Sequence, residues 1–97
     1  MSSLKLKIIT PNGIFLNSIE VNHVGVQTTA GDLTIYARHT PIVSTLQIGT
    51  VKYTNSEGVK YVHVHRGILQ VTREEVKLLT PWLYEIDDKG KQIGPKI

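Results

Sequence analysis

Residues 50–65 read TVKYTNSEGVKYVHVH, and this stretch decides the fold. Apolar and polar residues alternate on both sides of residues 55–58, Asn-Ser-Glu-Gly, a four-residue segment that ends in the Gly that hairpin loops favour. A period of two indicates strands whose successive side chains point to opposite faces of a sheet. We therefore predict a β-hairpin here, with Val62 and Val64 directed toward the core.

The same period continues toward both ends of the chain. Short alternating or apolar runs occupy residues 4–8, 14–16, 19–21, 24–26, 33–36, 42–48, 68–72, 76–80 and 82–86. The runs 19–21 and 24–26 are out of phase, which predicts a β-bulge or bend near Asn22 and His23. Turn signals recur every 8–12 residues or so, and no stretch has the period of a helix. The sequence therefore predicts an all-β fold, a β-sandwich of about ten strands in two antiparallel sheets.

The end of the chain differs in composition from the rest. After Ile86 the alternation stops, and residues 87–97 contain Gly90, Gly94 and Pro95 among mixed charges. Such a composition favours neither strand nor helix. We expect one β-sandwich domain over residues 1–86 and a flexible tail over residues 87–97, with no helix.

Composition excludes several classes of protein. The chain has 97 residues, 40% hydrophobic and 20% charged, which is the balance of an ordinary globular domain. It has no cysteine, so disulfides and thiolate metal sites are excluded. No apolar run approaches the roughly 20 residues that span a bilayer, and the first residues lack the apolar core of a secretory signal. We expect no direct insertion into a membrane.

Residues that could carry chemistry are few and scattered. His63 and His65 leave the same face of a strand and could hold zinc, but a site needs at least one more ligand. The alternative, two histidines on a solvated face, needs no third group. No nucleophile motif and no Gly-rich phosphate loop is present, and the acidic pairs Glu74-Glu75 and Asp87-Asp88 lie in turn-like segments. We expect no catalytic residue, no metal and no cofactor.

The aromatic residues leave a second possibility open. Tyr53 and Tyr61 are expected to pair across the hairpin, with Lys52 and Lys60 on the opposite side of the sheet. A surface that binds nucleic-acid bases needs aromatic side chains interleaved with basic ones. Here the tyrosines and the lysines would lie on opposite faces of the sheet. With a net charge of only +3 and no basic stripe, we expect no nucleic-acid binding. A free-standing ligand-binding β-sandwich that uses exposed Tyr53, Tyr61, Trp82 or Tyr84 stays an alternative.

An ordered series of short motifs resembles one family along residues 4 to 86 or so. These motifs are Thr10-Pro11-x-Gly13, Gly31-Asp32-Leu33-x-Ile35-Tyr36, His39-x-Pro41-Ile42, Leu46-x-x-Gly49, Tyr61-x-x-Val64, Gly67-Ile68-Leu69-x-Val71 and Val76-x-Leu78-Leu79. The series is similar to the N-terminal β-sandwich domain of the epsilon subunit of bacterial-type rotary ATP synthases.

The resemblance implies a mechanical role without an active site. A central-stalk (rotor) subunit of this kind binds the gamma subunit and the polar loops of the c-ring, and so couples ion flow to ATP synthesis. It would lie at the cytoplasmic face of the cell membrane as a peripheral part of the complex. In the family, a C-terminal helical hairpin follows the β-sandwich and carries ATP sensing and the inhibition of ATP hydrolysis. We expect no C-terminal helical hairpin in residues 87–97, and therefore neither activity.

The resemblance also implies contact residues. Asp32, Arg38 and His39 would lie in loops that face the c-ring. Thr40, Pro41 and Ile42 would contact the gamma subunit.

Some positions depart from the family pattern. The family has a Gly where this chain has Thr34 and Arg66, a Pro where it has Ala37, and an acidic residue where it has Gln70. Arg38 is bulkier than the small or polar residue that the family usually has at its position. Arg38 and Arg66 add positive charge in segments that the family uses for contact. An epsilon-like stalk subunit of a divergent assembly derived from a rotary ATPase is therefore a further alternative.

Overall fold

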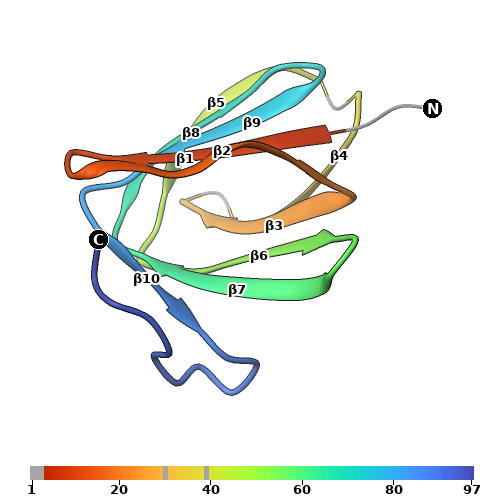
Figure 1. Ribbon diagram of the computed structural model, residues 1–97. Coiled ribbons are helices and arrows are strands. Elements are labelled where there is room, and N and C mark those ends of the chain that lie inside the picture. The colour runs from red at the N-terminus through yellow and green to blue at the C-terminus, as the bar shows by residue number, and fades with distance from the viewer. Residues whose placement is uncertain (1–3, 30, 39) are drawn as a thin grey trace.

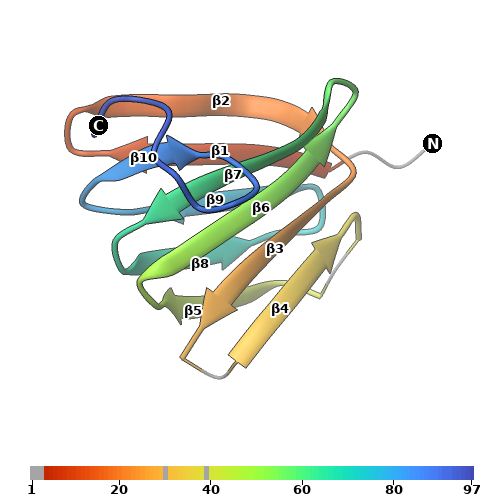
Figure 2. The ribbon, with the colours of Figure 1, turned by 90° about the horizontal axis from the view of Figure 1, so that it is seen from below.

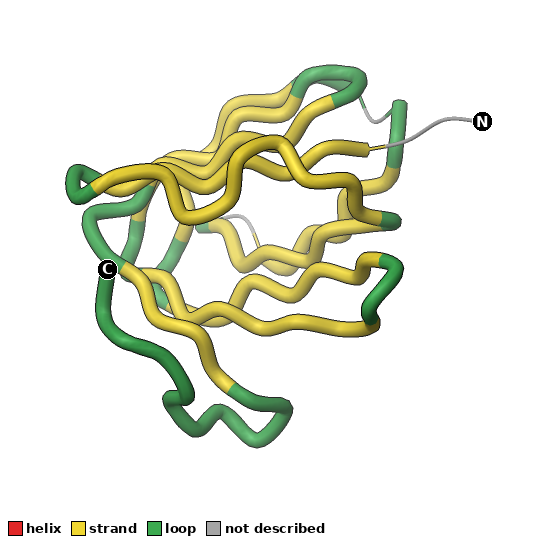
Figure 3. The backbone as a smooth tube through the Cα atoms, in the orientation of Figure 1, coloured by secondary structure: helices red, strands yellow, loops and turns green. Residues whose placement is uncertain are grey.

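The computed structural model describes residues 4–29, 31–38 and 40–97, and within them every regular element is a β-strand (Figure 3). The ten strands are β1 (Leu4–Thr10), β2 (Gly13–Val21), β3 (His23–Thr28), β4 (Gly31–Tyr36), β5 (Ile42–Leu46), β6 (Gly49–Asn55), β7 (Gly58–Val64), β8 (Gly67–Val71), β9 (Glu75–Leu79) and β10 (Leu83–Ile86). The predicted all-β fold of about ten strands is confirmed. The described ranges contain no helix long and apolar enough to cross a membrane.

The strands form two layers of one continuous, curled sheet. One layer has the order β4-β3-β6-β7-β10 and the other β5-β8-β9-β1-β2. In Figure 1 the second layer lies above β3, β6, β7 and β10, and β4 rises at the right toward it. The layers join at one corner, where Thr28 on β3 pairs with Leu46 on β5. Two backbone hydrogen bonds flank this pair, from the amide of Thr29 to the carbonyl of Thr45 and from the amide of Gln47 to the carbonyl of Gln27. The view from below in Figure 2 shows β3, β4, β6 and β7 crossing in front of the other layer.

Alternation explains why the core lies between the layers. Each strand turns one row of side chains inward, and the rows meet as one buried cluster. Its fully buried large members are Leu4, Leu6, Ile8, Val24, Ile35, Leu46, Val51, Val62, Val64, Leu69, Leu78 and Leu83. At about 25 cal/mol per Å² of apolar surface, burying each leucine or isoleucine contributes about 2–3 kcal/mol toward folding.

Not every pairing follows the expected antiparallel pattern. β1 and β9 are parallel, with Leu6 opposite Val76 and Ile8 opposite Leu78. The predicted bend is present at Asn22, between β2 and β3. An irregular register also occurs between β1 and β2, where Ser18 has a φ of 55° and donates a hydrogen bond to Glu75 Oε2 at 2.9 Å. The two expected runs 14–16 and 19–21 are thus one strand with a bulge.

The predicted pairing of Tyr53 with Tyr61 is wrong. The register of β6 with β7 places Tyr53 opposite Lys60 and Lys52 opposite Tyr61. Tyr53 therefore faces the core, at 4% exposure, while Tyr61 and Lys52 share the outer face. The cause is the turn, in which Asn55 still pairs with Gly58, so that the strands meet in a register that puts the tyrosines on opposite faces.

Residues 87–97, the segment expected to be a tail, reverse direction after β10 and run back along it. The amide of Ile93 donates a hydrogen bond to the carbonyl of Glu85 at 2.9 Å, and the side chain of Ile97 packs against the core. The flexibility expected of this segment stays a prediction. Its path, however, is defined by hydrogen bonds to the sheet.

Candidate functional site

The outer face of the β5-β8-β9-β1-β2 layer carries a row of apolar side chains. Ile68 on β8 lies opposite Leu79 on β9, Leu79 lies opposite Ile9 on β1, and Ile9 lies opposite Ile14 on β2. Ile68, Leu79 and Ile14 are 49%, 37% and 54% exposed. We call these four residues the apolar row. With neighbouring strands about 4.8 Å apart, the row extends across three strand spacings, about 14 Å.

A shallow groove runs beside the apolar row. Its volume is about 430 Å³, and it is lined by Ile9, Thr10, Pro11, Gly67, Ile68, Leu79, Thr80 and Pro81. Gly67 brings β8 and β9 close together, because a side chain there would clash with the backbone carbonyl of Leu79. Thr80 is buried, and its single hydroxyl proton is shared among the nearby backbone carbonyls of His65, Arg66 and Trp82. The arrangement is an apolar surface with a backbone-lined edge, suited to docking and not to bond chemistry.

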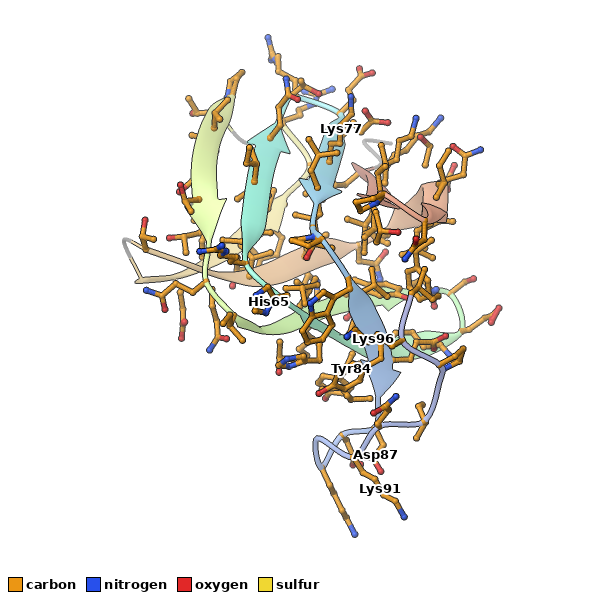
Figure 4. The ribbon with its side chains drawn as sticks, turned by 90° about the vertical axis from the view of Figure 1, so that its left-hand side faces the viewer. His65, Lys77, Tyr84, Asp87, Lys91 and Lys96 are labelled. Carbon is orange, nitrogen blue, oxygen red and sulfur yellow. The ribbon has the colours of Figure 1, made fainter. Side chains whose placement is uncertain are left out.

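Positive charge borders the apolar row on the same face. Lys7 on β1 lies opposite Lys77 on β9, one row away from Ile9 and Leu79, and Lys77 stands at the upper part of Figure 4. The next row toward the N-terminus of β1 is mixed, since Lys5 lies opposite Glu75. Two adjacent lysines beside an apolar strip favour a partner whose surface is apolar in the middle and acidic at its margin.

Asp32 and Arg38, expected to lie together, are at opposite ends of β4. Asp32 is exposed and lies opposite Gln27, whose carbonyl accepts a hydrogen bond from the amide of Gln47 at 3.0 Å. Arg38 follows the other end of the strand, where its amide donates to the carbonyl of Arg73 at 2.9 Å. The strand from Asp32 to Tyr36 alone spans about 13 Å, and Arg38 lies two residues beyond it in a turn. The structure thus does not bring this expected pair into one loop cluster.

The end of the sandwich at Asp32 carries two further exposed residues. Ile48, which is 56% exposed, follows Gln47 in the β5–β6 connection. Arg66 precedes Gly67, which lies opposite Leu46 at the end of β5. This end, with Asp32, Ile48 and Arg66, therefore combines an acid, an aliphatic side chain and a base.

The remaining expected contact residues are divided. His39 lies outside the described residues. Thr40 and Pro41 are exposed, and Ile42 begins β5 opposite Val71 with its side chain partly packed against the core. Part of Ile42 is therefore committed to packing. The contact roles expected of these residues stay predictions.

His63 on β7 and His65, which directly follows β7, take part in ring contacts. His65 stacks on Trp82 with centroids 4.8 Å apart, and His63 stacks on Tyr84 at 4.8 Å. Among the residues with described positions, no three His, Cys, Asp or Glu side chains come together as a metal site. Trp82 and Tyr84 also stack on each other with centroids 6.1 Å apart, so these two rings and the two histidines form one half-buried cluster. Tyr53 lies apart from this cluster, in the core.

Among the titratable groups that the structure describes, Tyr53 has a clearly shifted pKa. Burial, together with the nearby carboxylates of Glu85 and Glu57, raises the pKa of Tyr53 to about 12. All three effects disfavour the phenolate. Tyr53 is therefore a neutral core residue at physiological pH and has no access to a partner.

Sequence reasoning did not single out the apolar row. The signal was available in the doublets Ile8-Ile9, Ile68-Leu69 and Leu78-Leu79, which interrupt the alternation. Because neighbouring residues of a strand point to opposite faces, each doublet puts one apolar side chain outward. Only the pairing of strands shows that these outward residues are neighbours.

Comparison with known proteins agrees with this architecture. Residues 3–83 match the family described as ATP synthase, Delta/Epsilon chain, beta-sandwich domain. The ATP synthase epsilon chain of Staphylococcus aureus strain JH9 is 37% identical over 79 residues, which cover 81% of this chain and 59% of that protein, and the epsilon chain of strain Newman matches equally. The chain belongs to this β-sandwich domain family, which confirms the resemblance. It spans about three fifths of the length of the curated relatives that it matches.

Solved structures share the fold at lower identity. One is a structure of the Euglena gracilis mitochondrial ATP synthase that contains OSCP, F1 and the c-ring, with a TM-score of 0.82 at 18% identity over 92% of this chain and 59% of that chain. Another is the central stalk and c-ring of the Tetrahymena thermophila mitochondrial ATP synthase, with a TM-score of 0.70 at 16% identity over 84% of this chain and 65% of that chain. These likenesses show the shared β-sandwich.

Proposed function

We propose that this chain is a central-stalk subunit of an ATP synthase, without an active site of its own, that binds a gamma-type subunit through the apolar row. The observation that carries the proposal is the row itself: three side chains that are 37–54% exposed, Ile14, Ile68 and Leu79, are joined by cross-strand pairing through Ile9. Figure 1 shows no described element above this layer. The family and the names of the relatives support the same role.

The dimensions suit a helical partner. An α-helix presents an apolar residue about every 5.4 Å along one side, so a strip of about 14 Å can receive two to three turns. Gamma-type stalk subunits are coiled coils, which offer such a side. Burying the exposed parts of three aliphatic side chains would supply a few kcal/mol, and the adjacent Lys7 and Lys77 would orient an acidic margin of the helix.

The end of the sandwich with Asp32, Ile48 and Arg66 is the surface we assign to the c-ring. A carboxylate and a guanidinium at one end can pair with opposite charges on polar ring loops, worth about 0–1 kcal/mol each while exposed and more once water is excluded. The chain would then hold the stalk to the ring, so that rotation driven by ion flow reaches the catalytic head. It would act as a peripheral part of the complex at the cytoplasmic face of the membrane.

The test is binding of the full chain to a purified gamma-type subunit of the same synthase. We expect a complex at micromolar concentrations or below. Ile68→Asp should weaken it at least 10-fold, since it places an unpaired charge in the dried centre of the contact. Val59→Asp is the matched control, because Val59 on β7 is similarly exposed, at 46%, but belongs to the other layer. The absence of a complex at micromolar concentrations would contradict the proposal.

A further inference from the structure

β10 is the marginal strand of its layer, and its free side is covered by the chain itself. On one side β10 pairs with β7, with Leu83 opposite Val64. On the other side the amide of Leu83 donates to the carbonyl of Ile97 at 2.9 Å, and the amide of Ile97 donates back to the carbonyl of Leu83 at 2.7 Å. The amide of Ile93 donates to the carbonyl of Glu85 at 2.9 Å. We call residues 92–97 the latch.

A locally determined turn returns the chain to β10. Asp87 Oδ1 accepts hydrogen bonds from the amides of Lys89 and Lys91 at 2.9 and 2.8 Å, and the amide of Asp87 donates to the carbonyl of Lys91 at 2.9 Å. Gly90 has a φ of +88°, which residues with a side chain rarely adopt. Figure 4 shows Asp87 and Lys91 in this turn, below the tip of β10. The reversal therefore depends on Asp87 and Gly90, and not on the sheet.

Two side chains fasten the far end of the latch. The ammonium of Lys96 lies 4.3 Å from the centroid of the Trp82 ring, which also stacks on His65, and Figure 4 shows Lys96 near Tyr84 and His65. The side chain of Ile97 packs against the core. The rest of the latch has few buried contacts, since Gln92, Ile93 and Pro95 are exposed. A segment with few buried contacts opens at a lower free energy than the strands it covers.

We propose that the free edge of β10 is a strand-addition site for an extended peptide, which the latch fills as a releasable occupant. Opening of the latch exposes three backbone groups, the amide and carbonyl of Leu83 and the carbonyl of Glu85. Their natural partner is another strand. Opening of the latch also uncovers the core position that the Ile97 side chain occupies and one face of the Trp82 ring. The peptide that fits carries a lysine or arginine directly followed by an aliphatic residue, as the latch does. This inference is independent of the role in a rotor stalk.

Amide hydrogen exchange of the full chain tests whether the latch opens separately. The amides of Leu83, Ile93 and Ile97 should exchange as one group, at least 100-fold faster than the amides within the β6–β7 pairing. Lys96→Ala should accelerate this group a further 2- to 5-fold or so, the range of a cation–π contact. Exchange of the three amides at the rate of the β6–β7 amides would show that they open only with the whole domain, and would overturn the proposal.

A glycine pair provides the matched control. Gly90→Ala should accelerate the same three amides about 5- to 30-fold, because alanine at a positive φ is strained. Gly58 also has a positive φ, +118°, and open space around it, but it lies in the β6–β7 turn. Gly58→Ala should destabilise the domain as a whole. It should not raise the exchange rate of the latch amides relative to that of the other amides of the domain. Equal effects of the two substitutions on the latch amides would contradict a local latch.

Occupation by a peptide is tested with the full chain carrying Gly90→Ala. The probe is the heptapeptide Lys-Gln-Ile-Gly-Pro-Lys-Ile, the sequence of residues 91–97, at millimolar concentration to compete with the tethered copy. We expect saturable shifts of the amide of Leu83 and of the indole of Trp82, the only tryptophan of the chain. A peptide with its lysines replaced by alanine should bind more weakly. Equal shifts with a scrambled heptapeptide, or none, would overturn strand addition.

Discussion

Ile68 and Leu79 lie directly opposite each other on β8 and β9, and both side chains point away from the core. In a monomeric sheet such cross-strand pairs on the outer face are usually polar on at least one side. Here the pair is continued by Ile9 and Ile14, so the outward apolar residues form a strip and not isolated points. A contiguous strip of this kind is typical of a docking surface.

Replacing the pair with threonine separates docking from packing. Ile68→Thr with Leu79→Thr keeps the preference for strand and removes most of the exposed apolar surface. We expect the free energy of unfolding in urea to change by less than about 1 kcal/mol, because both residues are half-exposed. Affinity for the gamma-type subunit should fall at least 10-fold. A loss of stability comparable to that of a core substitution would make the pair structural.

Gly67 determines how closely β8 and β9 approach beside the groove. Gly67→Ala places a methyl group against the backbone of Leu79 and should destabilise the domain by about 1–3 kcal/mol or more. Gly25→Ala is the control, since the nearest atoms, Cβ and the carbonyl oxygen of Lys52, lie 3.9 Å from the new methyl group. That variant should be near neutral. Thermal unfolding of the two variants measures the difference, and similar melting temperatures would contradict the close approach.

Arg38 occupies a backbone conformation that costs free energy, with a φ of 65°. Glycine adopts this conformation without a steric penalty, so Arg38→Gly should stabilise the isolated domain by about 0.5–1 kcal/mol. If Arg38 contacts a partner, the same variant should nevertheless assemble less well into the synthase. A more stable domain with unchanged assembly would leave Arg38 without a contact role.

Asp32 is exposed at the end of the sandwich that we assign to the c-ring. Asp32→Lys should weaken association with the isolated c-ring and make the remaining association less sensitive to salt, because a favourable charge pair is lost. Melting of the free domain should stay within about 0.5 kcal/mol of the parent, since surface substitutions rarely do more. Equal loss of stability and assembly would reassign Asp32 to a role within its own turn.

Tyr53 predicts how stability depends on alkaline pH. Its pKa is about 12 in the folded chain, above the value of about 10 for an exposed phenol, so the fold holds the proton more tightly than the unfolded chain does. This contribution is fully present below about pH 10 and is lost as the pH rises through about 12. The free energy of unfolding should therefore fall more steeply over that range in the parent than in Tyr53→Phe. Urea titrations at each pH measure both slopes, and identical slopes would refute the assignment.

Local sequence patterns predict much of the fold. Alternation in residues 50–54 and 59–65 determines which side chains of β6 and β7 are inward, because the pleat has a period of two regardless of neighbours. The bend at Asn22 followed from the same rule, since two runs out of phase cannot keep one inward face without it. The ordered motifs of residues 4–86 indicated the family for the same reason: they record turns and inward positions, which are local.

What sequence left undetermined is relative placement. The register of the β6–β7 turn decides whether Tyr53 lies opposite Tyr61 or Lys60. The course of β4 decides whether Asp32 and Arg38, which lie at its two ends, are close together. The apolar row joins β8, β9, β1 and β2, and its link between Leu79 and Ile9 is a parallel pairing that no local pattern specifies.

The latch depends likewise on packing beyond its own residues. Gly94 and Pro95 favour no regular structure, yet the edge of β10 and the ring of Trp82 give the latch partners. Side-chain direction is a property of the strand alone. Neighbours across strands are chosen by the free energy of the whole core, and the proposed docking surface and the strand-addition edge exist only after that choice.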